Sequence, residues 1–158
     1  MTLSMHQALR CARIAAFATI AVSDYSGAQP MTFEQTIRNH SNEPLAKSIG
    51  PVAKSLAIQT VFVPTEGVVG SGADRLKLKT AVDTQGSLWA YAYTSKSELT
   101  KAFPKGSQYA EMTFPSFFKI IEPNPQFGGI YLNSASDTRY PLPRQVFNSI
   151  KSQMPHAD

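Results

Sequence analysis

The part of the chain that most restricts its fold is the stretch of residues 89–99. Within it, residues 89–93 (WAYAY) alternate aromatic rings with alanines, a period of two that is typical of a β-strand with two different faces. Ser95 follows at once, and Glu98 comes three residues later, which is the spacing of a capping box at the start of a helix. The sequence therefore predicts a strand that passes directly into a capped helix ending near Phe103.

Similar patterns predict further elements on both sides of this stretch. Apolar residues spaced three and four apart indicate amphipathic helices, whereas β-branched and aromatic runs between turn residues indicate strands. The predicted helices lie near residues 33–38, 45–56, 114–121 and 143–150, and the predicted strands lie at residues 60–64, 76–82, 88–93, 109–112 and 129–133.

Together these elements predict one α+β domain at residues 31–158, with a mixed, mostly antiparallel sheet of about five strands and helices packed on it. The strands at 60–64, 76–82 and 88–93 follow one another through short turns, which predicts a three-stranded meander. Aromatic side chains alternating with alanine are typical of a sheet tightly covered on one side, so we expect Tyr91, Tyr93, Tyr131 and Tyr140 to fill the interface between sheet and helices. The alternative is that these rings form a stacking platform for single-stranded nucleic acid.

Residues 1–30 differ from the rest of the chain. Arg10 and Arg13 precede an apolar run at residues 14–22, and small residues follow, which is the order of a secretory signal peptide. The run is far shorter than the ~20 residues that span a bilayer, so no membrane span is predicted. The segment is read as an N-terminal extension or a signal peptide. We expect a cytoplasmic protein, or an exported one if residues 1–28 act as a signal.

Composition excludes several classes of protein. With 42% hydrophobic and 16% charged residues the chain is not disordered. The net charge of +4 comes from lysines and arginines that are scattered singly, which indicates a mildly basic surface and no nucleic-acid partner. Cys11 is the single cysteine, so an intrachain disulfide and a CxxC metal site are both excluded.

The residues that carry chemistry are sparse and far apart. His6, His40 and His156 have no metal-ligand spacing, and no serine lies in a GxSxG elbow. The glycines of residues 67–72 lead into a strand rather than a helix, which is typical of a hairpin tip and not of a phosphate cradle. The sequence therefore predicts no catalytic residue, no metal and no cofactor, and a protein that is not an enzyme.

One loop stands out as a candidate binding site. It begins at Asn133, at the end of a predicted strand, and contains Asp137, Arg139 and Tyr140, with Arg144 close behind at the start of the last helix. Loops at strand ends carry recognition because a rigid scaffold positions them. Exposed charges there would set the orientation and association rate of a protein partner. The alternative is an ordinary solvated turn.

Three of these segments resemble a known family. Residues 90–95 (AYAYTS) followed by Glu98 and Leu99, then the aromatic helix, then residues 129–136 (GIYLNSAS), resemble the bacterial SseB N-terminal domain family. The likeness extends over roughly residues 33–151. This chain has Ser134 and Ala135 where the family pattern has Pro and Gly.

The resemblance implies an α+β sheet domain without established catalysis, and it supplies no catalytic residues. It also implies associations with serine sensitivity and with secretion-linked gene neighbourhoods. The function expected from it is a non-enzymatic domain that binds another protein, accessory to a bacterial secretion, toxin-neutralising or regulatory system. A small ligand-binding domain or an enzyme of unrecognised type is the alternative.

Overall fold

The structure is a computed structural model that describes residues 31–40, 42–67 and 76–154. The predicted N-terminal extension and most of the glycine-rich hairpin tip lie outside these residues. The helices are α1 (Phe33–His40), α2 (Leu45–Leu56), α3 (Lys96–Ala102), α4 (Phe114–Ile121) and α5 (Phe147–Lys151), the last preceded by a 3-10 turn, η1 (Arg144–Val146). The strands are β1 (Thr60–Pro64), β2 (Thr80–Val82), β3 (Leu88–Ala92), β4 (Tyr109–Thr113), β5 (Phe127–Leu132) and β6 (Tyr140–Pro143).

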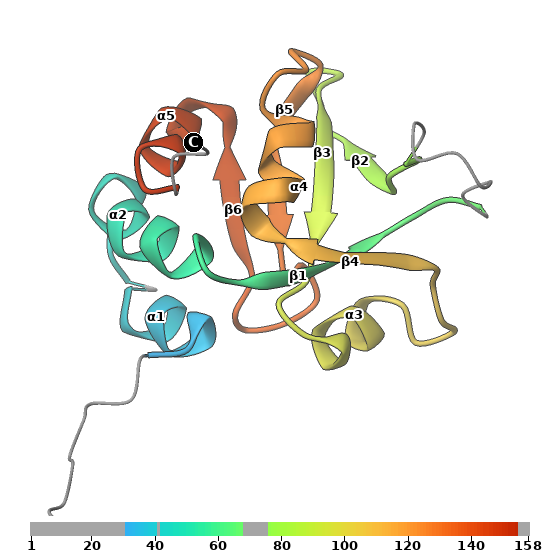
Figure 1. The fold of residues 1–158 in the computed structure, drawn as a ribbon, viewed down its shortest axis with the longest axis horizontal. Coiled ribbons are helices and arrows are strands. Elements are labelled where there is room, and N and C mark those ends of the chain that lie inside the picture. Colours follow the sequence, from blue (N-terminus) through green and yellow to red (C-terminus); the bar gives the residue numbers. More distant parts are fainter. Residues whose placement is uncertain (1–30, 41, 68–75, 155–158) are drawn as a thin grey trace, which may run out of the picture.

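The strands form two sheets (Figure 1). β1 and β4 pair antiparallel in the smaller sheet, and the larger sheet has the order β2-β3-β5-β6. Within the larger sheet β3 and β5 are parallel, while β2–β3 and β5–β6 are antiparallel. The predicted α+β class with a mixed sheet is therefore confirmed, although the described chain has six strands in two sheets.

The predicted meander is wrong in its first strand. β1 pairs with β4 along its whole length, and an isolated bridge between Thr65 and Leu78 is what joins its end to the chain before β2. The hairpin between β2 and β3 is confirmed, with Asp83 accepting backbone hydrogen bonds from Gln85 and Ser87, both 2.9 Å. Which strand β1 joins depends on a non-local pairing, which local turn signals do not specify.

The sequence does not predict strand β6, because residues 133–140 have the composition of a loop and Pro143 is the expected start of the last helix. Pro141 and Pro143 lack the backbone N–H that a central strand needs, which argues against a strand there. In the fold, β6 is the edge of its sheet and pairs on one side with β5. Since the two prolines occupy alternate positions, Tyr140 and Leu142 retain N–H groups for pairing.

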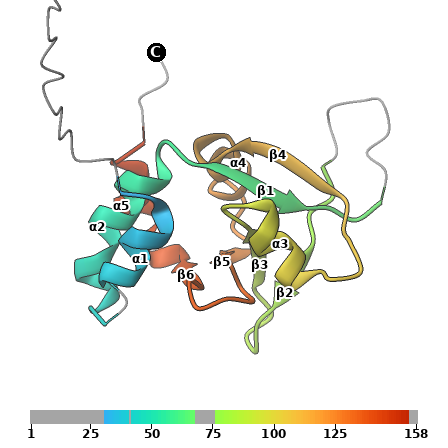
Figure 2. The same cartoon turned by 90° about the horizontal axis from the view of Figure 1, so that it is seen from below.

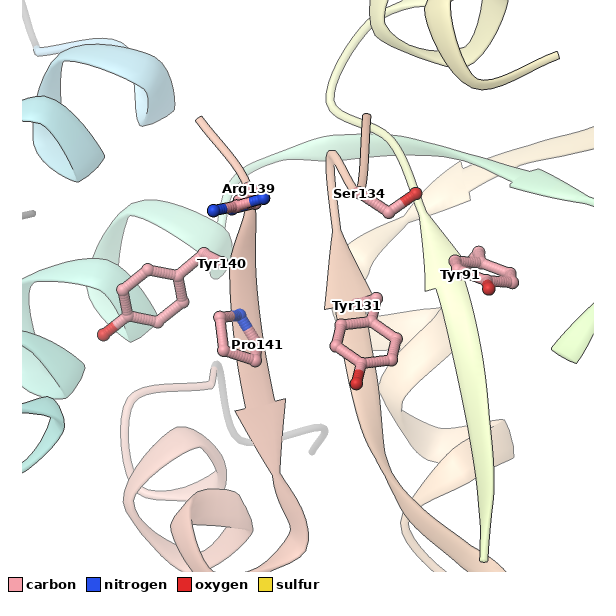
Figure 3. A pocket seen from close by; sticks show the side chains of 6 residues that line it. All are labelled: Tyr91, Tyr131, Ser134, Arg139, Tyr140 and Pro141. Carbon is pink, nitrogen blue, oxygen red and sulfur yellow. The ribbon is translucent and has the colours of Figure 1, made fainter. Parts of the chain in front are cut away.

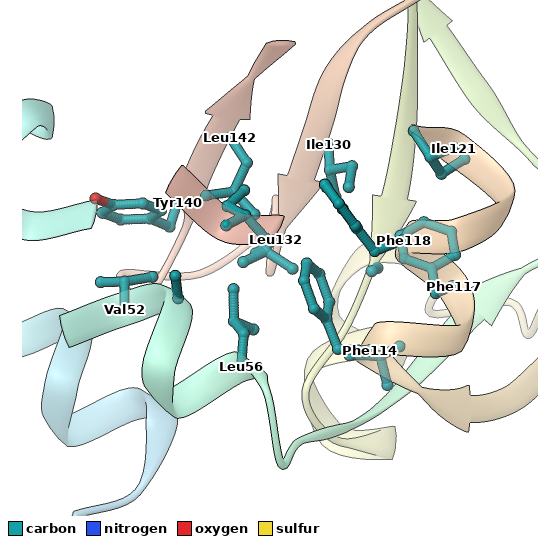
Figure 4. Close-up of a cluster of buried hydrophobic side chains, with 14 of the residues drawn as sticks. Val52, Leu56, Phe114, Phe117, Phe118, Ile121, Ile130, Leu132, Tyr140 and Leu142 are labelled. Atoms are coloured by element: carbon teal, nitrogen blue, oxygen red, sulfur yellow. The ribbon is translucent and has the colours of Figure 1, made fainter. Parts of the chain in front are cut away.

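The core lies between one face of the larger sheet and two helices. Figure 4 shows α2 and α4 packed against this face, with their apolar side chains meeting those of β5 and β6. Fully buried alanines of β3 belong to the same cluster, and rings from α4 supply its bulk. The main contributors are Val52, Leu56, Ala90, Ala92, Phe114, Phe117, Ile121, Ile130, Leu132 and Leu142. Burying each large side chain stabilises the fold by roughly 1.5–3 kcal/mol.

The capping residue of α3 is the one predicted. Ser95 Oγ accepts the backbone N–H of Glu98 at 3.2 Å. In a full capping box the Glu98 carboxylate would accept the backbone N–H of Ser95. Here the carboxylate accepts from Lys101 Nζ instead, at 2.6 Å. The helix therefore begins where the sequence predicts, at the end of β3, and fixes the direction in which that strand leaves the sheet.

Candidate functional site

The two faces of the larger sheet are covered differently. In Figure 2, α4 and the smaller sheet lie on one side of the larger sheet, and no described helix lies over the other side. Trp89, Tyr91 and Tyr131 project from this open face and are half-buried. We call these three residues the aromatic platform.

This placement corrects the expectation that the tyrosines fill the interface between sheet and helices. Tyr93 and Tyr140 are buried, at 1% and 9% exposure, but Tyr91 and Tyr131 lie on the open face. The alanines of β3 are the side chains that face the helices. Because these alanines are small, the aromatic side chains of α4 fill the core above them. Successive side chains of a strand point to opposite faces, so the rings of β3 point to the open face.

The platform is held in a fixed arrangement. The Trp89 indole stacks on the Tyr131 ring with centroids 4.5 Å apart, and Tyr131 stacks on Tyr91 at 6.1 Å. Trp89 Nε1 donates to Asp83 Oδ2 at 3.0 Å, and this bond is the largest cause that lowers the pKa of Asp83. A Cβ at Gly129 would lie 2.4 Å from the indole Cζ3, so glycine is what allows Trp89 to lie flat on β5.

A hollow of about 430 Å³ adjoins the platform (Figure 3). The register places Tyr91, Tyr131 and Pro141 side by side across β3, β5 and β6, and Figure 3 shows their side chains on one face with Arg139 beyond Pro141. The lining residues are Tyr91, Tyr131, Ser134, Arg139, Tyr140 and Pro141. The hollow is therefore aromatic along two strands and basic at one end.

A second hollow, of about 360 Å³, shares Arg139 with the first and continues toward α1 and α2. Its acidic side chains contact basic residues: Asp137 lies 3.2 Å from Arg38, and Glu43 lies 2.8 Å from His40 Nδ1. Arg139, in contrast, makes no ion pair with any other residue that the structure describes. One unpaired guanidinium thus lies where the two hollows meet.

The structure places Asn133 inside the fold. Its side chain is fully buried, with its Oδ1 accepting the Thr94 N–H at 3.0 Å and its Nδ2 donating to Thr94 Oγ1 and Thr138 Oγ1. Its φ of 46° lies in the left-handed region, which asparagine tolerates better than most residues. Asn133 therefore joins the end of β3 to the loop that carries Arg139, and supports the surface without forming part of it.

The other predicted residues separate into two groups. Asp137 and Arg139 are exposed near the hollows, and Tyr140 points away toward α2, where its hydroxyl lies 2.5 Å from Ser48 Oγ. Arg144 lies at the opposite end of β6 and donates to three backbone carbonyls, including those of Glu122 and Phe127. Arg144 closes the C-terminal end of α4, so the structure does not bring it together with Arg139.

Sequence reasoning favours buried tyrosines over an exposed stacking platform, and it does not single out Trp89 or Pro141 as surface residues. A signal was present in the glycine pair 128–129, because glycines in a strand indicate close approach by another group. At Gly129 that group is the indole of Trp89, and at Gly128 the Ser87 side chain lies nearest. The sequence does not specify which neighbouring side chain occupies the space.

Three groups near the platform have pKa values that are shifted away from neutral pH. Burial raises the pKa of Tyr93 and of Tyr140, which keeps both phenols neutral, and the pKa of Asp83 is lowered. Within residues 31–154 as far as they are described, no cluster of three or more His, Cys, Asp or Glu side chains could hold a metal ion. The arrangement can stack flat apolar groups and attract one negative charge.

Comparison with known proteins gives one match. The model of the family described as SseB protein N-terminal domain matches residues 33–148, which include every strand and the start of α5. Neither the curated proteins nor the solved structures yield a match. In the described parts of the chain, no helix has both the length and the apolar character that crossing a bilayer requires.

Proposed function

Because the chain belongs to the SseB N-terminal domain family, we propose that it is a non-enzymatic domain whose partner is another protein, and that the partner binds the aromatic platform. The observation that carries this proposal is the half-exposed stack of Trp89 on Tyr131 on the open face of the sheet. Exposed aromatic residues that are already rigid lose little entropy on binding and are enriched at the centres of protein interfaces.

The surroundings of the platform support the same function. Ser134 and Arg139 form a polar margin beside the rings, which is the usual anatomy of a protein interface. An enzyme of unrecognised type is the competing proposal, and it needs titratable groups whose pKa values are shifted toward neutrality. The shifts of Asp83, Tyr93 and Tyr140 go in the other direction, which favours a binding role.

The proposal also concerns the biological system to which the partner belongs. From the associations that the family resemblance implies, we propose that the partner belongs to a bacterial secretion, toxin-neutralising or regulatory system. A partner from such a system would be captured from the bacterium that encodes the chain and identified by mass spectrometry.

The experiment compares the unchanged chain with Tyr131→Ala and with Ile120→Ala as the matched control. Ile120 is a large apolar side chain, 45% exposed on α4, away from the open face. We expect a stoichiometric protein partner that is lost with Tyr131→Ala and kept with Ile120→Ala, while circular dichroism shows that both variants are folded. A partner that both variants retain equally, or a co-purifying metabolite without any protein, would contradict the proposal.

A further inference from the structure

We propose that the group that occupies the aromatic platform is an extended, proline-containing segment of the partner that carries an acidic side chain. In this arrangement proline rings lie on Tyr91 and Tyr131, and the carboxylate meets Arg139. The inference rests on the proposed function and specifies the chemistry of the partner. Three features of the described residues lead to it: the pairing of the strands, the spacing of the rings, and the charge at the edge of the platform.

The pairing of the strands excludes addition of a further strand at the platform. β3 is paired with both β2 and β5, and β5 is paired with both β3 and β6. Neither strand has a free edge to which a peptide could hydrogen-bond along its length, so the face can bind only through side chains. Among the common modes of peptide recognition, docking of a polyproline II segment on an aromatic surface has this property.

The spacing of the rings suits the same conformation. Tyr91, Tyr131 and Pro141 lie in register on three adjacent strands. Neighbouring strands are about 4.8 Å apart, so the row spans about 9.6 Å. One turn of a polyproline II helix has three residues and rises about 9.3 Å. A segment that crosses the strands would therefore bring residues three apart onto Tyr91 and Pro141, with a proline between them on Tyr131.

The charge at the edge of the platform favours an acidic ligand. Arg139 lies on the same face as Pro141, two residues away along the chain, and no described residue pairs with it. Asp137 and Glu43, the carboxylates of the adjoining hollow, already have basic partners. A carboxylate of the ligand therefore gains an ion pair without breaking one within the chain.

A single-stranded nucleic acid would also stack on exposed rings, but the charges disfavour it. Such binders need a positively charged groove that follows the phosphates. Here Asp83 is bonded to the edge of Trp89, and Asp137 lies close to Arg139 in sequence and lines the same hollow. A ligand with one or two carboxylates fits this mixture of charges better than a ligand with one charge per nucleotide.

Trp89 is the single tryptophan of the chain, so its fluorescence reports directly on the platform. The probe is a capped peptide of repeated Glu-Pro-Pro triplets, compared with one peptide in which Gln replaces Glu and another in which Ser replaces Pro. We expect the Glu-Pro-Pro peptide to change the Trp89 emission in a saturable manner. We expect the two replacement peptides to bind more weakly, and the Glu-Pro-Pro affinity to fall at about 1 M salt, where the Debye length is about 3 Å.

Variants locate the binding site. Arg139→Gln should weaken binding of the Glu-Pro-Pro peptide about threefold, as expected for an exposed ion pair, and should remove its advantage over the Gln peptide. Tyr131→Ala should weaken both by up to about tenfold. The matched control is Lys119→Gln, an exposed cation on α4, which should leave the affinity unchanged.

Several results would overturn the inference. Binding that is equal for the Glu and Gln peptides excludes the acidic requirement, and binding that is equal for the Pro and Ser peptides excludes the extended proline segment. Tighter binding of an oligothymidylate assigns the face to nucleic acid. A change of emission on concentrating the protein alone assigns it to a second copy of the chain. If no peptide binds but partner capture still depends on Tyr131, the inference is wrong while the proposed function stands; if capture is also independent of Tyr131, both fail.

Discussion

Replacing Gly129 with alanine tests whether Trp89 lies flat on the sheet. A Cβ at this position would lie 2.4 Å from Trp89 Cζ3 and 2.7 Å from the Leu142 carbonyl oxygen. Both distances are well inside van der Waals contact. The indole can swing away, but the carbonyl belongs to the paired backbone of β6 and cannot move without disturbing the ladder.

The size of the effect follows from these contacts. Extra atoms in a well-packed site cost about 1–3 kcal/mol, and the lower entropy of the unfolded chain offsets about 0.4–1 kcal/mol for Gly to Ala. We therefore expect Gly129→Ala to lower the free energy of unfolding by about 1–2 kcal/mol. For a domain of this size the Tm should fall by roughly 2–8 °C. Displacing Trp89 should also break its bond to Asp83 and shift its emission toward that of a solvated indole.

The assay combines thermal unfolding followed by circular dichroism with the emission spectrum of Trp89. A double-mutant cycle with Trp89→Ala separates the two clashes, because only the contact with the Leu142 carbonyl remains when the indole is absent. The cost of Gly129→Ala should then be about half as large. The reasoning is refuted if Gly129→Ala leaves both stability and emission unchanged, or if its cost is the same with and without Trp89.

Three further predictions concern residues of the proposed loop and its surroundings. Asn133→Ala leaves the buried Thr94 N–H without its acceptor and should cost about 3 kcal/mol in chemical denaturation, whereas Asn133→Gly should cost about 1 kcal/mol less because glycine accepts the positive φ. Arg144→Met removes three hydrogen bonds to backbone carbonyls at the end of α4 and should cost about 2 kcal/mol by the same measurement, with partner binding unchanged. Burial raises the pKa of Tyr140 above 10.0, so the stability it contributes is present below pH 10 and is lost as the pH rises through the folded value. Tyr140→Phe should therefore flatten the alkaline side of the stability–pH curve, with Ser48 losing its partner at every pH.

The local elements were predictable because their signals lie within a few residues. The alternation at residues 88–93, the cap at Ser95 and the aromatic spacing at residues 114–121 each report backbone preferences or one buried face, and each element forms as predicted. Strand β6 was missed because its two prolines oppose a strand by propensity, and an edge position in the sheet overrides that preference.

The candidate site was predictable only in part. The polar loop identified Asp137 and Arg139, which lie beside the hollows, because charged residues after a strand are a local signal. The alternation of rings and alanines along β3 predicts two different faces, but either the rings or the alanines could point to the helices. The choice depends on the tertiary packing. The sequence also does not show that Asn133 is buried, because the groups that bind it come from Thr94 at the end of another strand.

Crosslinking from the platform in living cells tests the central claim most directly. A photoreactive phenylalanine analogue replaces Tyr131 on the open face in one strain and Ile120 on α4 in a second strain. Both side chains are accessible, and α4 lies on the opposite side of the larger sheet from the open face that carries Tyr131 (Figures 2 and 3). The account predicts a discrete crosslinked protein from position 131 and none from position 120. Equal crosslinking from the two positions, or crosslinking from position 120 alone, would contradict it.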